Sequence, residues 1–121
     1  EDNNSRKVSS TAFVMLHEMA HMWFGNLVNI GWWDELYLKE AMADYTSWQA
    51  YDNWWANSEM NKLRYCHPKI FFAGRKTQGC FEDTQQFASR ALKGPNEYAA
   101  DSVWMYSRIT YGKGFSVMRE L

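Results

Sequence analysis

The sequence predicts a mainly α-helical segment, and two patterns support this prediction. Apolar residues recur at helical spacing over several stretches, and no stretch alternates apolar and polar side chains as a half-buried strand does. The 121 residues include seven each of tryptophan, tyrosine, phenylalanine and methionine, which supply the apolar area for a packed core. A chain of this length forms at most one ordinary domain.

The first predicted helix covers residues from about 9 to 24. Four apolar residues share one of its faces: Phe13, Leu16, Ala20 and Phe24. We expect its N-cap among residues 9–11, where hydroxyl side chains cluster, and its end at Gly25.

A second helix is predicted from about 34 to 51, after an extended or looped stretch over 26–33. Asp34 is a suitable N-cap residue for it. Its apolar positions are Leu36, Leu38, Met42, Tyr45 and Trp48.

The rest of the chain predicts shorter helices separated by turns. Turn-forming residues gather at 73–79 and 93–96. The helices are expected over 53–72, 84–92, 97–109 and the residues after Gly112.

Charge and hydropathy exclude two classes of partner. Thirteen basic against fourteen acidic residues leave a net charge of −1, with no basic block for nucleic acid or an anionic membrane. The longest apolar run, 12–16, is far shorter than the ~18 residues of a membrane-spanning helix. We therefore expect no nucleic-acid partner and no membrane segment in these residues.

The cysteines and the chain ends say little about the cellular compartment, which stays open. Cys66 and Cys80 are too few for a disulfide framework, and are either two free thiols or one optional bridge. The sequence begins without Met and ends inside an apolar helical pattern over 114–121. We therefore expect it to be a segment of a larger protein.

The residues that point to chemistry are His17-Glu18-Met19-Ala20-His21. On a helix, the two histidines at i and i+4 lie on one face and can bind one metal ion, with Glu18 beside it. This is the spacing of zinc peptidases.

A catalytic zinc needs three protein ligands and an open position for water. Glu40, 19 residues after His21, is the candidate third ligand if the stretch over 26–33 reverses the chain. Glu35 competes with it, although a carboxylate near a helix start also favours the helix dipole. The prediction is one zinc ion held by His17, His21 and Glu40.

Two segments resemble the alanyl aminopeptidase (aminopeptidase N) family of zinc metallopeptidases. The first runs from His17-Glu18-Met19-Ala20-His21-Met22-Trp23-Phe24-Gly25-Asn26-Leu27-Val28 through Trp32-Trp33-Asp34-Glu35-Leu36-Tyr37-Leu38-Lys39-Glu40, and the second is Ile109-Thr110-Tyr111-Gly112-Lys113-Gly114. The resemblance is dense over 11–51 and resumes at 109–117. It implies that the chain is the helical, zinc-bearing part of a thermolysin-like catalytic domain.

The resemblance also implies a reaction and partners. Residues 1–121 would be a partial catalytic domain with a zinc helix at 9–24, a third-ligand helix at 34–51 and a catalytic tyrosine segment at 109–121. Glu18 would act as the general base, and Tyr111 would stabilise the tetrahedral intermediate. The substrate would be a peptide cleaved at its N-terminal residue, and the remaining polypeptide would supply a sheet and flanking domains. Alternatives are a catalytically silent zinc-binding scaffold and a leukotriene hydrolase-type enzyme.

Some residues depart from the family pattern or have two interpretations. Met22 replaces a common Gln, and Lys39, Ala41 and Met42 replace Asn, Gly and Phe around the third ligand. Ser47 stands where many relatives have Glu, so the support of the ligands is expected to differ. Asp44 either supports a ligand histidine or is a solvated helix carboxylate.

The remaining aromatic and methionine residues are expected to pack, and two other polar residues have no assigned catalytic role. His67 lacks an i+4 partner and is expected to be structural or exposed, and Lys113 is a cation of unassigned role at a helix start. The packing residues are Trp32, Trp33, Trp48, Trp54, Trp55 and Trp104, with Met15, Met19 and Met22 as core fillers.

Overall fold

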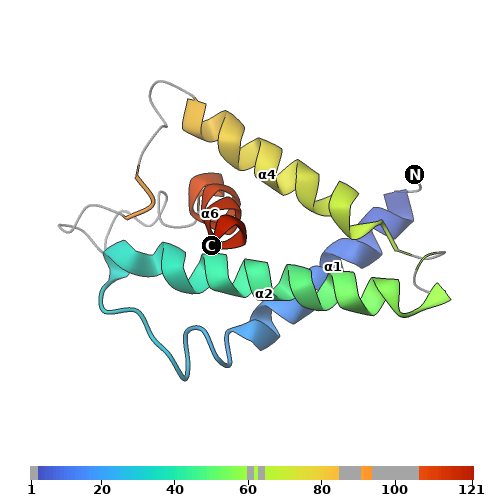
Figure 1. The fold of residues 1–121 in the computed structure, drawn as a ribbon, viewed down its shortest axis with the longest axis horizontal. Helices are drawn as coiled ribbons and strands as arrows, with labels where there is room; N and C mark the ends of the chain where they lie inside the picture. The colour runs from blue at the N-terminus through green and yellow to red at the C-terminus, as the bar shows by residue number, and fades with distance from the viewer. Residues whose placement is uncertain (1–2, 60–61, 63–64, 85–90, 94–106) are drawn as a thin grey trace.

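The chain folds into packed helices, as predicted. The computed structural model describes residues 3–59, 62, 65–84, 91–93 and 107–121. Helix α1 crosses α2, α4 lies along the other side of the molecule, and α6 lies between α2 and α4 (Figure 1). Within the described residues the only β pairing is an isolated bridge between Phe24 and Val28. The prediction of a mainly α-helical chain is therefore confirmed.

Helix α1 spans Asn3–Ala20, so it begins and ends earlier than the predicted 9–24. Ser9 is not an N-cap, because its hydroxyl donates to the carbonyl of Ser5 and accepts from the backbone N–H of Cys66. Thr11 likewise donates to the carbonyl of Lys7. Such bonds to the carbonyl four residues earlier occur inside helices. Beyond Ala20 the chain turns, and Gly25 has a φ of 135°, which favours glycine.

Helix α2 spans Leu36–Ala56 and follows a short 3₁₀ turn, η1, at Trp33–Glu35. The predicted helix over 34–51 is therefore present but ends later. Asp34 lies inside the 3₁₀ turn and is buried, and no side chain caps α2. The expected N-cap at Asp34 is therefore wrong.

Helix α4 spans Pro68–Thr84, and its position corrects two predictions. A single helix over 53–72 is wrong, because α2 ends at Ala56, residues 57–58 and 65–67 are not helical, and α4 begins at Pro68, a residue suited to a helix start. Glu59 and Lys62, between α2 and α4, are helical. The predicted turn over 73–79 is also wrong, because these residues lie within α4. Turn-forming residues here are overridden by packing, above all at Gly79, where α4 comes into backbone contact with another segment.

The last part of the chain begins with a π-helical turn, η2, at Ile109–Lys113, and continues as α6 at Gly114–Glu120. The expected helix after Gly112 is therefore present, with an unpredicted π turn before it. The helices predicted at 84–92 and 97–109 fall mostly outside the described residues. Ala91 and Leu92, which are described, are not helical.

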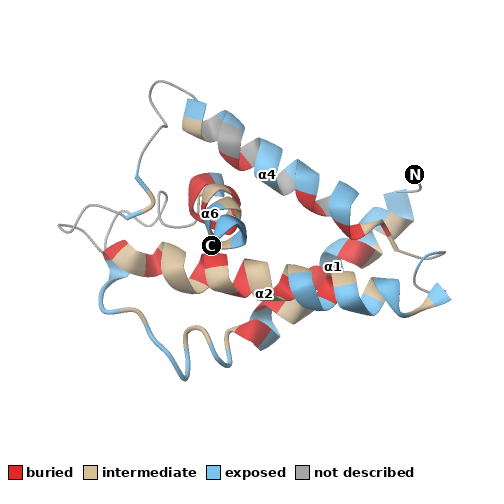
Figure 2. Cartoon of the chain, in the orientation of Figure 1, coloured by how far each residue is buried: buried red, intermediate tan, exposed pale blue. Residues whose placement is uncertain are grey.

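The core is aromatic and joins α1, α2, α4 and α6. It is centred on Phe13, Tyr51, Phe72 and Phe115. The rings of Phe13 and Phe72 pack edge to face at 5.0 Å, and those of Phe72 and Phe115 stack at 5.7 Å. Buried and exposed residues alternate along each helix, as expected for helices that pack on one side (Figure 2).

Several residues expected to pack are exposed instead. The methionines Met15, Met19 and Met22 are about 60% exposed, so the prediction that they fill the core is wrong. Trp32 and Trp33 are also exposed, whereas Trp48 packs on the core, Trp55 packs on the ring of His67, and the partly exposed Trp54 packs on the ring of Tyr65 at 4.7 Å. Trp104 lies outside the described residues.

Two further sequence expectations can be compared with the described residues. Cys66 is a buried free thiol. Of the two interpretations, two free thiols or one bridge, Cys66 fits the first. The side chain of Cys80 lies outside the description. In the described part of the chain, no helix combines the length and apolarity needed to cross a membrane.

Candidate metal centre

The two histidines of the sequence motif share one face at the end of α1. His21 lies just past Ala20, and its backbone N–H donates to the carbonyl of His17 at 3.2 Å, which continues the helical geometry. Their Nε2 atoms lie 3.0 Å apart. The i, i+4 spacing therefore brings both imidazoles to one point in space.

Glu40 completes the cluster from the second turn of α2. Its Oε2 lies 3.3 Å from Nε2 of His17 and 3.3 Å from Nε2 of His21, and the residue is buried. Glu35 lies elsewhere, where its carboxylate pairs with Lys93 at 3.5 Å. Among the described residues, His17, His21 and Glu40 are the group whose donor atoms lie close enough together for a metal ion.

The hydrogen bonds of each imidazole fix its tautomer. Nδ1 of His17 lies 2.8 Å from Oδ1 of Asp44, and Nδ1 of His21 lies 2.8 Å from the carbonyl oxygen of Phe24. Because a carboxylate and a carbonyl accept hydrogen bonds, each Nδ1 carries the hydrogen and donates it. In the neutral rings, both Nε2 lone pairs then point at the carboxylate of Glu40. Three electron-rich atoms in contact repel one another unless a cation lies between them.

The distances fit a zinc ion. Zinc binds imidazole nitrogen and carboxylate oxygen at about 2.0–2.2 Å in tetrahedral geometry, which separates neighbouring ligand atoms by about 3.3 Å. The three separations in the cluster are 3.0, 3.3 and 3.3 Å. The donor set is also the one that zinc prefers in catalytic sites, with three protein ligands and room for a fourth.

The electrostatics of the cluster follow from the same contacts. Burial lowers the pKa of His17, but the hydrogen bonds and negative charges of Asp44 and Glu40 outweigh it and raise this pKa to about 9. Burial raises the pKa of the Glu40 carboxyl, yet its interactions with His17, His21 and Lys39 lower it overall. The cluster therefore attracts positive charge, either as a proton on His17 or as a metal cation.

Asp44 was left with two interpretations by the sequence, and its contacts decide between them. The residue is 1% exposed and is paired with His17, so it is not a solvated carboxylate. It lies one turn after Glu40 on the same face of α2. A carboxylate that holds Nδ1 of a ligand histidine orients the ring and increases its basicity.

Tyr111, 71 residues after Glu40, lies beside the cluster. It belongs to the π turn η2, and its ring centre is 6.1 Å from that of His17. Single π turns in helices are frequent at functional sites. Glu18 occupies the exposed side of α1 next to His17.

Two contacts of the cluster were missed by the sequence analysis. The first is the hydrogen bond between Nδ1 of His21 and the carbonyl of Phe24. The local sequence indicates it only through the position of Phe24, three residues after His21 in a turn. Nζ of Lys39 lies 3.6 Å from Oε1 of Glu40, whereas the histidines contact Oε2. Ser47, expected to alter the support of the ligands, donates a hydrogen bond to the carbonyl of Ala43.

The other polar residues singled out in the sequence are structural. Nδ1 of His67 accepts a hydrogen bond from the backbone N–H of Lys69, and its ring packs on Trp55 at 4.2 Å. His67 is therefore outside the metal cluster, as expected. Lys113 pairs with Asp83 of α4 at 3.0 Å.

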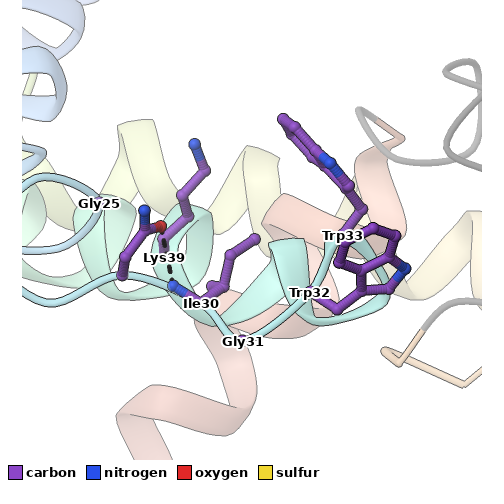
Figure 3. A pocket seen from close by; sticks show the side chains of 7 residues that line it. Gly25, Ile30, Gly31, Trp32, Trp33 and Lys39 are labelled. Atoms are coloured by element: carbon purple, nitrogen blue, oxygen red, sulfur yellow. Dashed lines mark hydrogen bonds between the residues drawn. The ribbon is translucent and has the colours of Figure 1, made fainter.

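A cavity of about 280 Å³, shown in Figure 3, is lined in part by Lys39, the residue that precedes Glu40. Lys39 also contacts the cluster, because its Nζ lies 3.6 Å from Oε1 of Glu40. Trp32 and Trp33 form part of the wall, so these tryptophans line a surface cavity here instead of a core. The complete lining is Gly25, Asn29, Ile30, Gly31, Trp32, Trp33 and Lys39.

Two histidines four residues apart on one helix, with a carboxylate from the next helix, form the arrangement of zinc metallopeptidases. The family model described as the peptidase family M1 domain matches residues 1–121. The chain belongs to peptidase family M1.

Individual relatives agree with this family. The chain is 32% identical to a leucyl aminopeptidase of Saccharolobus solfataricus over 89% of its length, and 32% identical to a membrane alanyl aminopeptidase of Heliothis virescens over 98%. An aminopeptidase N of Streptomyces lividans is 29% identical over 91% of the chain. The matched regions cover 13%, 11% and 12% of these relatives, so the chain spans about an eighth of their length. No solved structure matches the chain.

Proposed function

We propose that the protein is a zinc-dependent aminopeptidase that removes N-terminal residues from peptides, and that residues 1–121 carry its metal centre. The observation that carries the proposal is the convergence of two Nε2 lone pairs and a buried carboxylate within 3.3 Å of one another. Membership of the M1 family and relatives named as aminopeptidases support the reaction.

In this proposal His17, His21 and Glu40 hold the ion, and Asp44 and the Phe24 carbonyl orient the two rings. Zinc bound there supplies a Lewis acid that lowers the pKa of water and polarises a peptide carbonyl. The remaining chemistry belongs to side chains of this chain.

Glu18 acts as general base. Its carboxylate accepts a proton from the attacking water and passes it to the nitrogen of the leaving amine as the C–N bond breaks. The exposure of Glu18 on α1, next to a ligand histidine, is consistent with contact to water and substrate.

We assign Tyr111 to the stabilisation of negative charge on the substrate. Its hydroxyl donates a hydrogen bond to the carbonyl oxygen of the substrate as negative charge develops there, an interaction typically worth ~3 kcal/mol in the transition state. The closeness of its ring to His17 supports this role.

The test is metal-dependent hydrolysis by the full-length protein. We expect release of the chromogenic group from alanyl and leucyl anilides, loss of this activity after treatment with a chelator, and its return with stoichiometric Zn²⁺. Metal analysis of the same sample should give one zinc per chain at this site.

The matched control is the N-acetylated form of the same substrate, which an aminopeptidase leaves intact. Binding of zinc without hydrolysis of either substrate would indicate the silent scaffold instead. Hydrolysis unaffected by removal of the metal would refute the proposal.

Tyr111→Phe is expected to lower kcat by about 10²-fold and to change KM little, since the lost hydrogen bond forms mainly in the transition state. Steady-state kinetics with zinc measured in the same sample tests this. The control is Tyr45→Phe, because the Tyr45 hydroxyl accepts a hydrogen bond from Gln49 on an exposed face. Near-normal kcat in Tyr111→Phe would mean that Tyr111 only packs, and a raised KM at unchanged kcat would make it a substrate-binding residue.

A further inference from the structure

The π turn that carries Tyr111 is in direct backbone contact with α4. A Cβ atom built on Gly79 would lie 2.7 Å from the carbonyl carbon of Gly112 and 2.7 Å from the nitrogen of Lys113. Both distances are shorter than real Cβ contacts, so only glycine fits at position 79. Alanine is the better helix former, and a glycine inside a helix therefore has a reason other than the helix itself.

Gly114, which directly follows the π turn as the first residue of α6, packs just as closely against α2. A Cβ on Gly114 would lie 2.9 Å from the Cβ of Ala41, the residue that follows Glu40. Tyr111 thus sits in a turn that is held by α4 on one side and by the ligand-bearing helix α2 on the other.

An ion pair strengthens the contact with α4. Nζ of Lys113 lies 3.0 Å from Oδ1 of Asp83, which is one helical turn after Gly79. Both side chains are about 30% exposed. The ion pair and the glycine contact join the same two segments.

We propose that Gly79 is a positioning residue for the reaction: by admitting the π turn to backbone contact with α4, it sets the place of Tyr111 at the metal centre. This proposal rests on the proposed function, because it needs Tyr111 to act on the substrate.

The expected effect follows from the packing. An alanine at position 79 needs the contact to open by about 0.7 Å or more to reach an ordinary distance. The turn cannot move toward α2 without closing the Gly114 contact further, so the tyrosine is displaced. A misplacement of about 1 Å can cost 10²-fold in rate.

The experiment compares Gly79→Ala with Gly74→Ala in the full-length protein. Gly74 is the matched control, because it lies on the same helix and a Cβ there meets nothing within 4 Å. We expect Gly79→Ala to lower kcat about 10- to 100-fold with little change in KM and in zinc content. Gly74→Ala should stay within about twofold of the wild type.

Binding of a phosphinic dipeptide, which mimics the tetrahedral intermediate, gives a readout that does not depend on turnover. Its Kd should rise in Gly79→Ala and in Tyr111→Phe, and not in Gly74→Ala. A displaced Tyr111 hydroxyl would weaken the binding of this ligand. A general loss of packing far from the site would leave its Kd unchanged.

A double mutant separates a positioning role from a structural one. If Gly79 acts through Tyr111, adding Gly79→Ala to Tyr111→Phe lowers kcat no further. Effects that multiply fully, or a normal kcat in Gly79→Ala, would overturn the proposal.

If Gly79→Ala does not fold, Asp83→Asn tests the same contact more mildly. Asp83→Asn alone should lower kcat by a few fold. The same substitution added to Tyr111→Phe should not lower kcat further, and equal losses in both backgrounds would overturn the proposal. A wild-type protein without zinc-dependent hydrolysis would refute the proposed function and this inference together. Zinc-dependent hydrolysis with fully multiplying effects would refute this inference alone.

Discussion

Glu18→Gln in the full-length protein is expected to lower hydrolysis of aminoacyl anilides by about 10²- to 10⁴-fold while zinc content stays at one per chain. The amide has nearly the same shape as the carboxylate and can hydrogen-bond water, but it cannot accept a proton. Because the side chain is exposed on α1, the substitution leaves no buried group without a partner, and little change in stability is expected.

The control for this prediction is Glu120→Gln, an exposed glutamate near the end of α6. It should have normal kinetics. Activity of Glu18→Gln within a few fold of the wild type would remove Glu18 from the role of base. Loss of zinc in this variant would mean that Glu18 supports the metal instead.

Replacement of either histidine of the proposed zinc site is expected to remove most of the zinc. His17→Ala or His21→Ala leaves two of the three protein ligands, and the carboxylate of Glu40 loses one of its two imidazole neighbours. We expect less than about a tenth of the wild-type zinc after dialysis, with hydrolysis lost in proportion.

His67→Ala is the matched control, because His67 packs on Trp55 and lies outside the cluster. It should retain full zinc content. Wild-type zinc content in both His17→Ala and His21→Ala would refute the assignment of the site.

The helical character and the two histidines could be predicted from the sequence because both are matters of local geometry. Residues at i and i+4 lie on one face of any α-helix, whatever it packs against. Helix ends were less predictable. Ser9 and Thr11 were predicted as N-cap residues, yet their hydroxyls donate hydrogen bonds to backbone carbonyls inside α1.

Predictions that required packing information were wrong or stayed open. The turn residues around Gly79 lie inside a helix because another backbone segment contacts that glycine, and no local pattern records such a contact. The exposed methionines of α1 were predicted to be core residues because an apolar side chain in a sequence does not show whether another element packs against it.

Taken alone, the sequence determined the histidine pair of the candidate metal centre and the helix that presents it, because the spacing of residues along one helix fixes how their side chains are directed. The choice of Glu40 over Glu35, the pairing of Asp44 with His17 and the approach of Tyr111 were decided only by the tertiary structure. These contacts join residues 19 to 94 positions apart in the sequence. Their geometry depends on how closely α1, α2, α4 and the π turn can pack, which is set by the side-chain volumes at all of their contacts together.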